Sequence, residues 1–263
     1  MPQKFDPINF SEKISADPKC HATLSSDRYT SPDFMRLEWE KIWTQCWLFA
    51  GLESDVKDVG EFFVYDIGRE SIIVTRNENN KISAFYNTCQ HRGNKILTQE
   101  SGWVKQVSCP YHGWTYGLDG ALRGAPAMTQ NKDFDKKKYC LPKIKCEEWL
   151  GWIMISLNPD VKPIQKSLSE VSDLIGDFEM ETYTQTFFET HVWDTNWKVL
   201  AENFMESYHL PVCHAGTIGG LSKLEEMDCP PGREAFNYHF ILKEPHFKLA
   251  NAHPNNTRLK GDW

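Results

Sequence analysis

Short runs of alternating apolar and polar side chains fill the middle of the chain. These runs are rich in Val, Ile, Phe and Tyr, and they cover residues 61–67, 70–76, 81–86 and 152–157. Such runs, bounded by turn residues at 77–80 and 117–120, predict β-strands. We therefore predict a small all-β domain over residues 45–158.

Helical spacing of apolar residues marks the segments on either side of this domain. Ser31 is a suitable N-cap for a helix over residues 32–47, and Pro32 suits its first position. The apolar residues spaced to form its buried stripe are Phe34, Leu37, Trp39, Ile42 and Trp43. The other predicted elements are helices over residues 168–180 and 199–209 and strands over residues 187–193 and 234–242. Together these elements predict an α+β chain.

Composition narrows the class of protein. The 263 residues are 40% hydrophobic and 25% charged, which is ordinary for a globular protein. A net charge of −7 argues against a nucleic-acid partner. No apolar run approaches the roughly 18 residues that a membrane span needs, and the start of the chain does not resemble a signal peptide. We expect a cytoplasmic protein with no membrane partner, in which most of the eight cysteines are free thiols.

Two Cys/His pairs stand in the predicted β domain. Cys89 and His91 form the first pair, Cys109 and His112 form the second, and 17 residues separate the pairs. Two thiolates and two imidazoles at this spacing predict a Rieske [2Fe–2S] centre, in which one iron takes both cysteines and the other takes both histidines. Neutral imidazole ligands raise the potential of such a cluster to about −150 to +300 mV. The sequence therefore predicts a one-electron carrier.

A structural zinc site with the same four ligands is the alternative. Zinc fingers usually keep like ligands together, as two cysteines followed by two histidines. Here each pair combines one Cys with one His. The arrangement therefore favours an iron–sulfur cluster over zinc.

A second set of polar residues lies about 100 positions downstream. His209 and His214 are candidate ligands of a mononuclear Fe(II) in a site of two histidines and one carboxylate. Pro211 is expected to end the helix near His209, so that the next loop presents His214. Asn203, Glu206 and His209 have the spacing of one helical face. Taken alone, this pattern also fits surface or core histidines and a solvated carboxylate.

The runs Cys89–Gly93 and Cys109–Trp114 together resemble the fingerprint of Rieske non-haem iron oxygenases, in the alpha subunit of the oxygenase component. The resemblance implies a Rieske domain over residues 45–158 and a helix-grip catalytic domain with a curved antiparallel sheet. Residues 1–44 would form a helical segment of the catalytic domain, and residues 159–263 an incomplete remainder of it. It also implies a head-to-tail homotrimer.

The resemblance assigns roles at the second site. It implies that His209 and His214 bind Fe(II), and that Asn203 and Glu206 are catalytic. Glu206 would carry electrons from His112 of the neighbouring subunit to an iron-ligand histidine. A glutamate only three residues after Asn203 resembles the branch that acts on choline, glycine betaine and carnitine.

The third iron ligand has no match in the sequence. The resemblance implies a carboxylate far downstream, and the acidic residues Glu225, Glu226, Asp228 and Asp262 match it by type only. We expect this ligand to lie beyond Trp263, in a chain that is truncated at its C-terminus.

The resemblance further implies a terminal oxygenase that receives electrons, ultimately from NAD(P)H, through a flavin and iron–sulfur reductase or a ferredoxin. With O2 it would hydroxylate or oxidatively demethylate a small organic substrate, for which a quaternary amine is one candidate. Aromatic faces could surround such a cation, and the residues of suitable type are Phe187, Trp193, Phe204, Tyr208 and Phe240. The alternatives are an aromatic-ring hydroxylating oxygenase, a Rieske electron carrier and an inactive truncated homologue.

Overall fold

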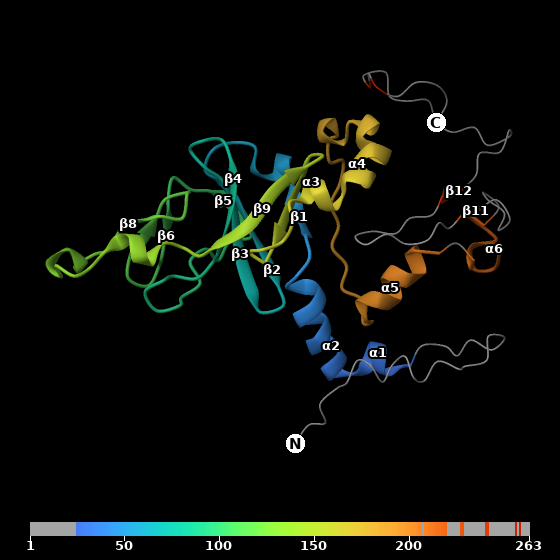
Figure 1. Cartoon of the computed structure of the whole chain (residues 1–263), viewed down its shortest axis with the longest axis horizontal. Coiled ribbons are helices and arrows are strands. Elements are labelled where there is room, and N and C mark those ends of the chain that lie inside the picture. The colour runs from blue at the N-terminus through green and yellow to red at the C-terminus, as the bar shows by residue number, and fades with distance from the viewer. Residues whose placement is uncertain are drawn as a thin grey trace. The chain divides into compact units, whose positions relative to one another are not determined.

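A computed structural model describes residues 25–206, 208–219, 227, 228, 240, 241, 256 and 258. The chain divides into two compact units (Figure 1). One unit comprises residues 43–184, and the other comprises residues 1–42 together with 185–263. The domain limits given above remain a prediction.

A seven-stranded antiparallel sheet forms the frame of the unit over residues 43–184. Its strand order is β1-β10-β9-β4-β3-β2-β5. The strands are β1 (Leu48–Leu52), β2 (Glu61–Ile67), β3 (Glu70–Arg76), β4 (Ile82–Tyr86), β5 (Ser101–Trp103), β9 (Lys143–Trp149) and β10 (Trp152–Ser156). The strands predicted over 61–67 and 70–76 are confirmed, and those over 81–86 and 152–157 are confirmed to within one residue.

Apolar side chains explain why these strands assemble. Ile72, Ile73 and Val74 follow one another in β3 and are all fully buried, so both faces of this central strand are covered. The side chain of Asn77 accepts the backbone N–H groups of Asn79 and Lys81 at 2.9 and 3.2 Å, which builds the predicted turn between β3 and β4. A run of β-branched residues followed by an Asn turn therefore encodes this hairpin.

A three-stranded sheet packs on one face of the larger sheet. Its strands are β6 (Val107–Ser108), β7 (Thr115–Tyr116) and β8 (Leu122–Gly124). Val107, Tyr116 and Leu122 share one buried cluster with Phe62 and Phe85 of the larger sheet. The predicted turn at 117–120 is confirmed by a hydrogen bond from the N–H of its last residue to the carbonyl of its first, at 2.9 Å.

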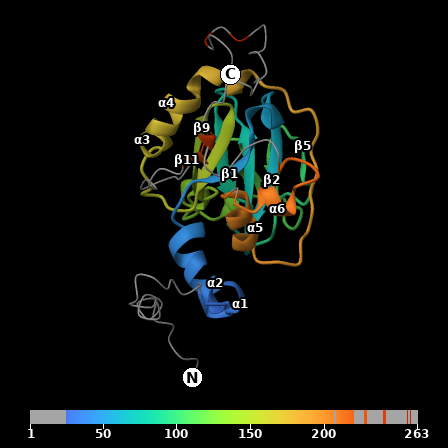
Figure 2. The same cartoon turned by 90° about the vertical axis from the view of Figure 1, so that its right-hand side faces the viewer.

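Two short helices pack against residues of β9 and β10. They are α3 (Ile164–Ser167) and α4 (Ser169–Ile175), drawn in yellow beside the sheet in Figure 2. Ile164, Leu168 and Val171 contact the cluster of Trp149 and Met154. The helix predicted over 168–180 is therefore shorter than expected, and single 3₁₀ turns (η6, Gly176–Phe178; η7, Met180–Thr182) follow it.

The described N-terminal part of the other unit contains α1 (Asp27–Thr30) and α2 (Pro32–Glu38), and the chain continues as the π-helix η2 (Trp39–Trp43). The Ser31 cap is confirmed, because its hydroxyl accepts the N–H of Phe34 at 3.4 Å. The helix ends earlier than the predicted Trp47. The predicted apolar stripe is found only in part, because Ile42 is exposed and the buried residue of α2 is Glu38. The other four residues of the stripe are half-buried: Phe34, Leu37, Trp39 and Trp43.

The C-terminal part of this unit contains α5 (Trp197–Phe204), α6 (Leu210–Cys213) and the antiparallel pair β11 (Met227–Asp228) and β12 (Phe240–Ile241). The helix predicted over 199–209 ends at Phe204. The strand predicted over 187–193 is wrong, since that segment has no regular structure and exposes Phe187 and Val192. The strand predicted over 234–242 lies outside the described residues except for β12.

The described elements confirm the α+β class. Among the six described cysteines, which are Cys46, Cys89, Cys109, Cys140, Cys146 and Cys213, no disulfide bond is formed. Within the described part of the chain, no helix is long and apolar enough to cross a membrane.

Candidate metal centres

Two loops of the same backbone pattern carry the predicted cluster ligands. The first ligand loop (Cys89–Asn94) follows β4, and the second ligand loop (Cys109–Trp114) joins β6 to β7. In each loop the carbonyl of the cysteine accepts the N–H of the glycine four residues later, at 2.9 and 3.0 Å. The N–H of each cysteine donates to the carbonyl of the last loop residue, at 2.9 and 2.8 Å. Each loop is therefore closed by its own backbone.

A glycine in the left-handed region completes each loop. Gly93 has φ +71° and Gly113 has φ +68°. A Cβ at Gly93 would meet nothing within 4 Å, and a Cβ at Gly113 would lie 3.6 Å from Pro126, which is an ordinary contact. Backbone conformation rather than space therefore requires glycine at both positions.

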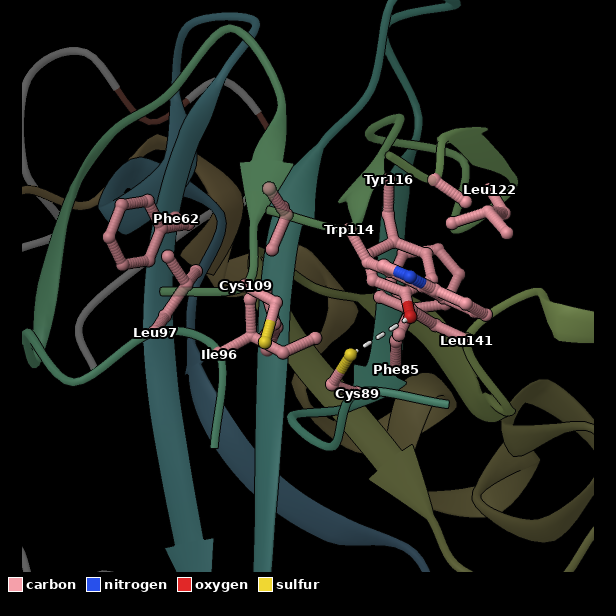
Figure 3. Packing of buried hydrophobic residues seen from close by; sticks show 13 residues of the cluster. Phe62, Phe85, Cys89, Ile96, Leu97, Cys109, Trp114, Tyr116, Leu122 and Leu141 are labelled. Atoms are coloured by element: carbon pink, nitrogen blue, oxygen red, sulfur yellow. Dashed lines mark hydrogen bonds between the residues drawn. The ribbon is translucent and has the colours of Figure 1, made fainter. Parts of the chain in front are cut away.

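The four predicted ligands divide into a buried pair and an exposed pair. Cys89 is 2% and Cys109 3% exposed, and both belong to the buried cluster drawn in Figure 3. His91 and His112 are exposed, and their ring centroids lie 4.6 Å apart. Thiolates on the inside and imidazoles on the outside fit a [2Fe–2S] cluster with two ligands on each iron.

Aromatic rings flank both histidines. Trp114 stacks on His91 with centroids 4.9 Å apart and planes 9° apart, and the Tyr111 ring lies 3.8 Å from that of His112. The pKa of His91 lies below its usual value because of desolvation and the nearby positive charges of His112 and Arg92. A lowered pKa favours neutral imidazole, which is the form that binds a metal.

Tyr116 is a residue of this site that the sequence analysis missed. Its hydroxyl lies 3.3 Å from the Sγ of Cys89 (Figure 3). The same hydroxyl accepts the N–H of Gln90 at 3.0 Å. Burial, followed by the contact with Cys89, raises the pKa of Tyr116 well above its usual value. The hydroxyl therefore keeps its proton and can donate it toward the sulfur. A fully buried tyrosine needs such a partner, but the sequence does not say which.

At the second site, Glu206 lies against His209. One carboxylate oxygen contacts Nδ1 of His209, and the other accepts the backbone N–H groups of Tyr208 and His209. The pKa of Glu206 is lowered, chiefly by its hydrogen bond to the His209 ring. The rings of His209 and His214 lie 5.3 Å apart. Asn203 is exposed in the last turn of α5.

The route by which these residues meet differs from the prediction. Asn203, Glu206 and His209 do not share a helical face, because α5 ends at Phe204. Pro211 does not end a helix but lies in the first turn of α6, and His214 follows that helix directly. The short helix α6 thus brings together two histidines that lie five positions apart.

The third iron ligand is not found among the described side chains. Across the described residues, no group of three or more His, Cys, Asp or Glu side chains is placed to hold one metal ion. A Rieske cluster does not require such a group, since each iron takes two protein ligands. Of the acidic candidates, Glu225, Glu226 and Asp262 lie outside the described residues, and Asp228 is described only as part of β11.

The aromatic residues considered for a quaternary ammonium group do not form a cage. Phe187, Trp193, Phe204 and Tyr208 are each more than half exposed. The side chain of Phe240 lies outside the described residues. In the described part of the chain, these residues do not enclose a cation.

Comparisons with known proteins match both halves of the chain. Residues 46–145 match the family of the Rieske [2Fe-2S] domain. Residues 178–257 match the ring hydroxylating alpha subunit (catalytic domain). The first match contains both ligand loops, and the second contains α5 and α6. The expected pairing of a Rieske β domain with part of a catalytic domain is therefore confirmed.

Relatives at moderate identity act on quaternary amines. The chain is 30% identical over 226 residues to the glycine betaine monooxygenase oxygenase subunit of Chromohalobacter salexigens, covering 86% of this chain and 51% of that protein. It is 35% identical over 206 residues to the chloroplastic choline monooxygenase of Beta vulgaris, covering 75% and 45%.

The chain is also similar to a solved structure of an enzyme that acts on the same class of compound. It is that of a quaternary ammonium Rieske monooxygenase with an inhibitor, and the TM-score is 0.72 at 26% identity. The match covers 82% of this chain and 60% of that chain. The present chain spans about half the length of the curated relatives it matches.

Proposed function

Because the chain belongs to the alpha subunits of the Rieske non-haem iron oxygenases, we propose that it is the terminal oxygenase component of a monooxygenase for a small quaternary amine. One observation carries this proposal: the chain holds the four cluster ligands and also the contact of Glu206 with His209. A protein that only carries electrons has no use for the second set. The similarity to glycine betaine and choline monooxygenases supports the substrate class.

In this proposal the two ligand loops hold the cluster. Cys89 and Cys109 bind one iron, His91 and His112 bind the other, and the bound cluster supplies one-electron transfer. Burial of the cysteines keeps water away from their sulfur atoms. The exposed histidine rings offer an edge through which an electron can leave toward another protein surface.

Glu206 has two tasks in this proposal. By holding Nδ1 of His209, its carboxylate fixes the ring and leaves Nε2 free for a metal. His209 and His214 would hold Fe(II), which activates O2 when it is bound, with a carboxylate from outside the described residues as third ligand. In a head-to-tail homotrimer, Glu206 would also contact His112 of the neighbouring subunit and complete the electron path. Asn203 would assist at the same site.

The glycine betaine relative is named as an oxygenase subunit, which implies a separate reductase as its electron donor. We propose a flavin and iron–sulfur reductase that oxidises NAD(P)H, or a ferredoxin reduced by one. Such a donor would deliver one electron at a time to the cluster.

Oxygen uptake with a defined substrate panel tests the proposal. The purified protein, loaded with iron and sulfide and supplied with a reductase, is offered glycine betaine, choline, carnitine and benzoate. We expect substrate-dependent O2 uptake and an oxidised product with at least one quaternary amine, and three irons per chain. The variant His209→Ala should retain the visible spectrum of the cluster and lose the uptake.

Two outcomes would contradict the proposal. Turnover of benzoate alone would replace the quaternary amine with an aromatic substrate. Two irons per chain and no O2 uptake with any substrate would leave an electron carrier or an inactive homologue.

A further inference from the structure

A lysine and a glutamate are buried against each other in the unit that carries the second site. Lys198 lies in the first turn of α5 and is 4% exposed, and Glu38 at the end of α2 is 3% exposed. Nζ of Lys198 lies 2.7 Å from Oε1 of Glu38. The chain separates these residues by 160 positions, so the contact joins its N-terminal segment to α5.

Three aromatic rings enclose the ammonium group. Nζ of Lys198 lies 5.7 Å from the ring centre of Tyr29, 5.2 Å from that of Phe34 and 5.4 Å from that of Trp197. Aromatic faces attract a cation that has lost its water. Although the two groups are in contact, neither the ammonium of Lys198 nor the carboxylate of Glu38 makes a hydrogen bond of good geometry. A buried pair of this kind adds little net stability over packed apolar side chains of similar volume, but removal of one partner leaves the other charge buried and unpaired. The contact between the two segments is therefore lost when one partner is replaced and kept when both are replaced together.

Tyr29 ties the same two segments together in a second way. The Asn196 amide donates to the carbonyl of Tyr29 at 3.0 Å, and its oxygen caps α5 by accepting the N–H of Lys198 at 3.0 Å. The Tyr29 hydroxyl donates to Glu202 at 2.7 Å, and Arg28 lies 3.4 Å from the same carboxylate. The cap, the first turn and the second turn of α5 are thus all held by residues 28–38.

We propose that Lys198 is a positioning residue, and that residues 28–38 form a clamp that sets the direction of α5. Lys198 and Glu202 lie four positions apart and so face the clamp together. Asn203 follows Glu202 directly, and Glu206 lies two positions after the last residue of the helix. The clamp therefore determines the position of the Glu206 carboxylate, which holds the ring of His209. This inference rests on the proposed function in that Glu206 and His209 serve a mononuclear iron.

A variant that removes one charge of the pair is compared with a variant that removes both charges. Lys198→Met removes one charge and strands the Glu38 carboxylate in an apolar cage. The double variant Glu38→Leu/Lys198→Met replaces both charges with apolar side chains that can still pack. Lys41→Met is the matched control, since Lys41 is an exposed lysine of η2.

The full chain in each form is measured in three ways. Hydrogen exchange followed by mass spectrometry reports on residues 199–204 of α5. Titration with Fe(II) reports the affinity of the mononuclear site, and the visible spectrum reports cluster loading in the other unit. For Lys198→Met we expect exchange in α5 at least tenfold faster and Fe(II) affinity at least tenfold weaker, with an unchanged cluster spectrum. The double variant should recover both quantities to within about threefold, and Lys41→Met should match the wild type.

Wild-type exchange in α5 and wild-type Fe(II) affinity in Lys198→Met would overturn the clamp. So would uniformly faster exchange across the whole unit with unchanged Fe(II) affinity, which is the mark of a merely structural contact. If Lys198→Met does not fold, the double variant still decides, because a folded double variant with weakened Fe(II) binding contradicts a clamp made by packing. A wild-type chain that binds no mononuclear iron would overturn the proposed function instead, and the exchange rates alone would then decide on the clamp.

Discussion

Gly120 lies so close to the ring of Phe85 that a Cβ at this position would come within 2.7 Å of Cδ1 of that ring. Its φ of +81° is also in the left-handed region. Two independent requirements therefore call for glycine where the turn between β7 and β8 meets the buried cluster. The same residue accepts the N–H of Leu141 through its carbonyl at 2.8 Å.

We expect Gly120→Ala to be far more destabilising than Gly93→Ala. The alanine at Gly93 meets only the strain of the left-handed conformation, which costs about 1–2 kcal/mol. The alanine at Gly120 adds a clash with a core ring, worth about 1–3 kcal/mol more. Urea unfolding followed by fluorescence gives both values. Equal losses in the two variants would show that the turn yields freely to the methyl group.

The Tyr116 hydroxyl is expected to raise the reduction potential of the cluster. Reduction adds negative charge to the cluster sulfurs, and a donor 3.3 Å from the Sγ of Cys89 stabilises that charge. Tyr116→Phe should therefore lower the potential by roughly 20–60 mV, which corresponds to one hydrogen bond in a one-electron couple. A redox titration followed by electron paramagnetic resonance measures the change.

Tyr139→Phe is the matched control for this experiment. The Tyr139 ring packs edge-on against Trp114, 5.5 Å away, so the variant removes a hydroxyl from the same aromatic layer. Its potential should stay within about 10 mV of the wild type, well below the shift from one hydrogen bond. A potential that is unchanged in Tyr116→Phe, or lowered equally in both variants, would refute a specific contribution from the Tyr116–Cys89 contact.

Asn87 is expected to be the polar residue on which the first ligand loop depends most. It is 1% exposed, its oxygen accepts the N–H groups of Ile96 and Leu97 at 3.0 and 2.9 Å, and its amide donates to the carbonyl of Leu97 at 2.7 Å. Asn87→Leu strands these buried groups, at about 1–3 kcal/mol each. We expect a loss of at least about 3 kcal/mol in the free energy of unfolding.

The exposed Asn131 provides the comparison, because its side chain accepts one local N–H at 3.0 Å. Asn131→Leu should cost less than about 1 kcal/mol. Asn87→Asp should fall between the two variants, since it keeps the accepted bonds and loses the donated ones. If Asn87→Leu were as stable as Asn131→Leu, the loop would not depend on Asn87.

Features encoded by neighbouring residues could be predicted from the sequence. Ile72, Ile73 and Val74 favour a buried strand on their own, and Asn77 builds its own turn. The class of the fold and the two ligand loops follow from such short-range patterns. The Tyr116–Cys89 contact spans 27 positions, so it depends on how the hairpin of β6 and β7 packs. No periodicity in the sequence reveals it.

At the second site, residue spacing predicted the wrong local structure. The spacing of Asn203, Glu206 and His209 fits one helical face, but the Glu206 carboxylate captures the backbone N–H groups of Tyr208 and His209. A side chain that bonds the backbone locally competes with the helix, and here the helix stops at Phe204. The spacing of residues in the sequence gives no measure of that competition. It predicted that Glu206 and His209 lie together, but not that they meet outside a helix.

The thiol of Cys146 is expected to lower the stability of the protein at alkaline pH. Burial in β9, with a smaller effect of Glu148 and Glu147, raises the pKa of Cys146 to about 12. An unfolded cysteine has a pKa of about 8.5, so folding favours the protonated thiol. Its contribution to stability is fully present below about pH 8.5 and is lost as the pH rises toward 12. We expect the urea midpoint to fall across this window, and to fall less steeply in Cys146→Ala.

The raised pKa values of Tyr65 and Tyr86, both caused chiefly by burial, act in the same direction, so the variant should weaken the dependence of stability on pH without abolishing it. Parallel curves for the two proteins would show that Cys146 is not the group responsible.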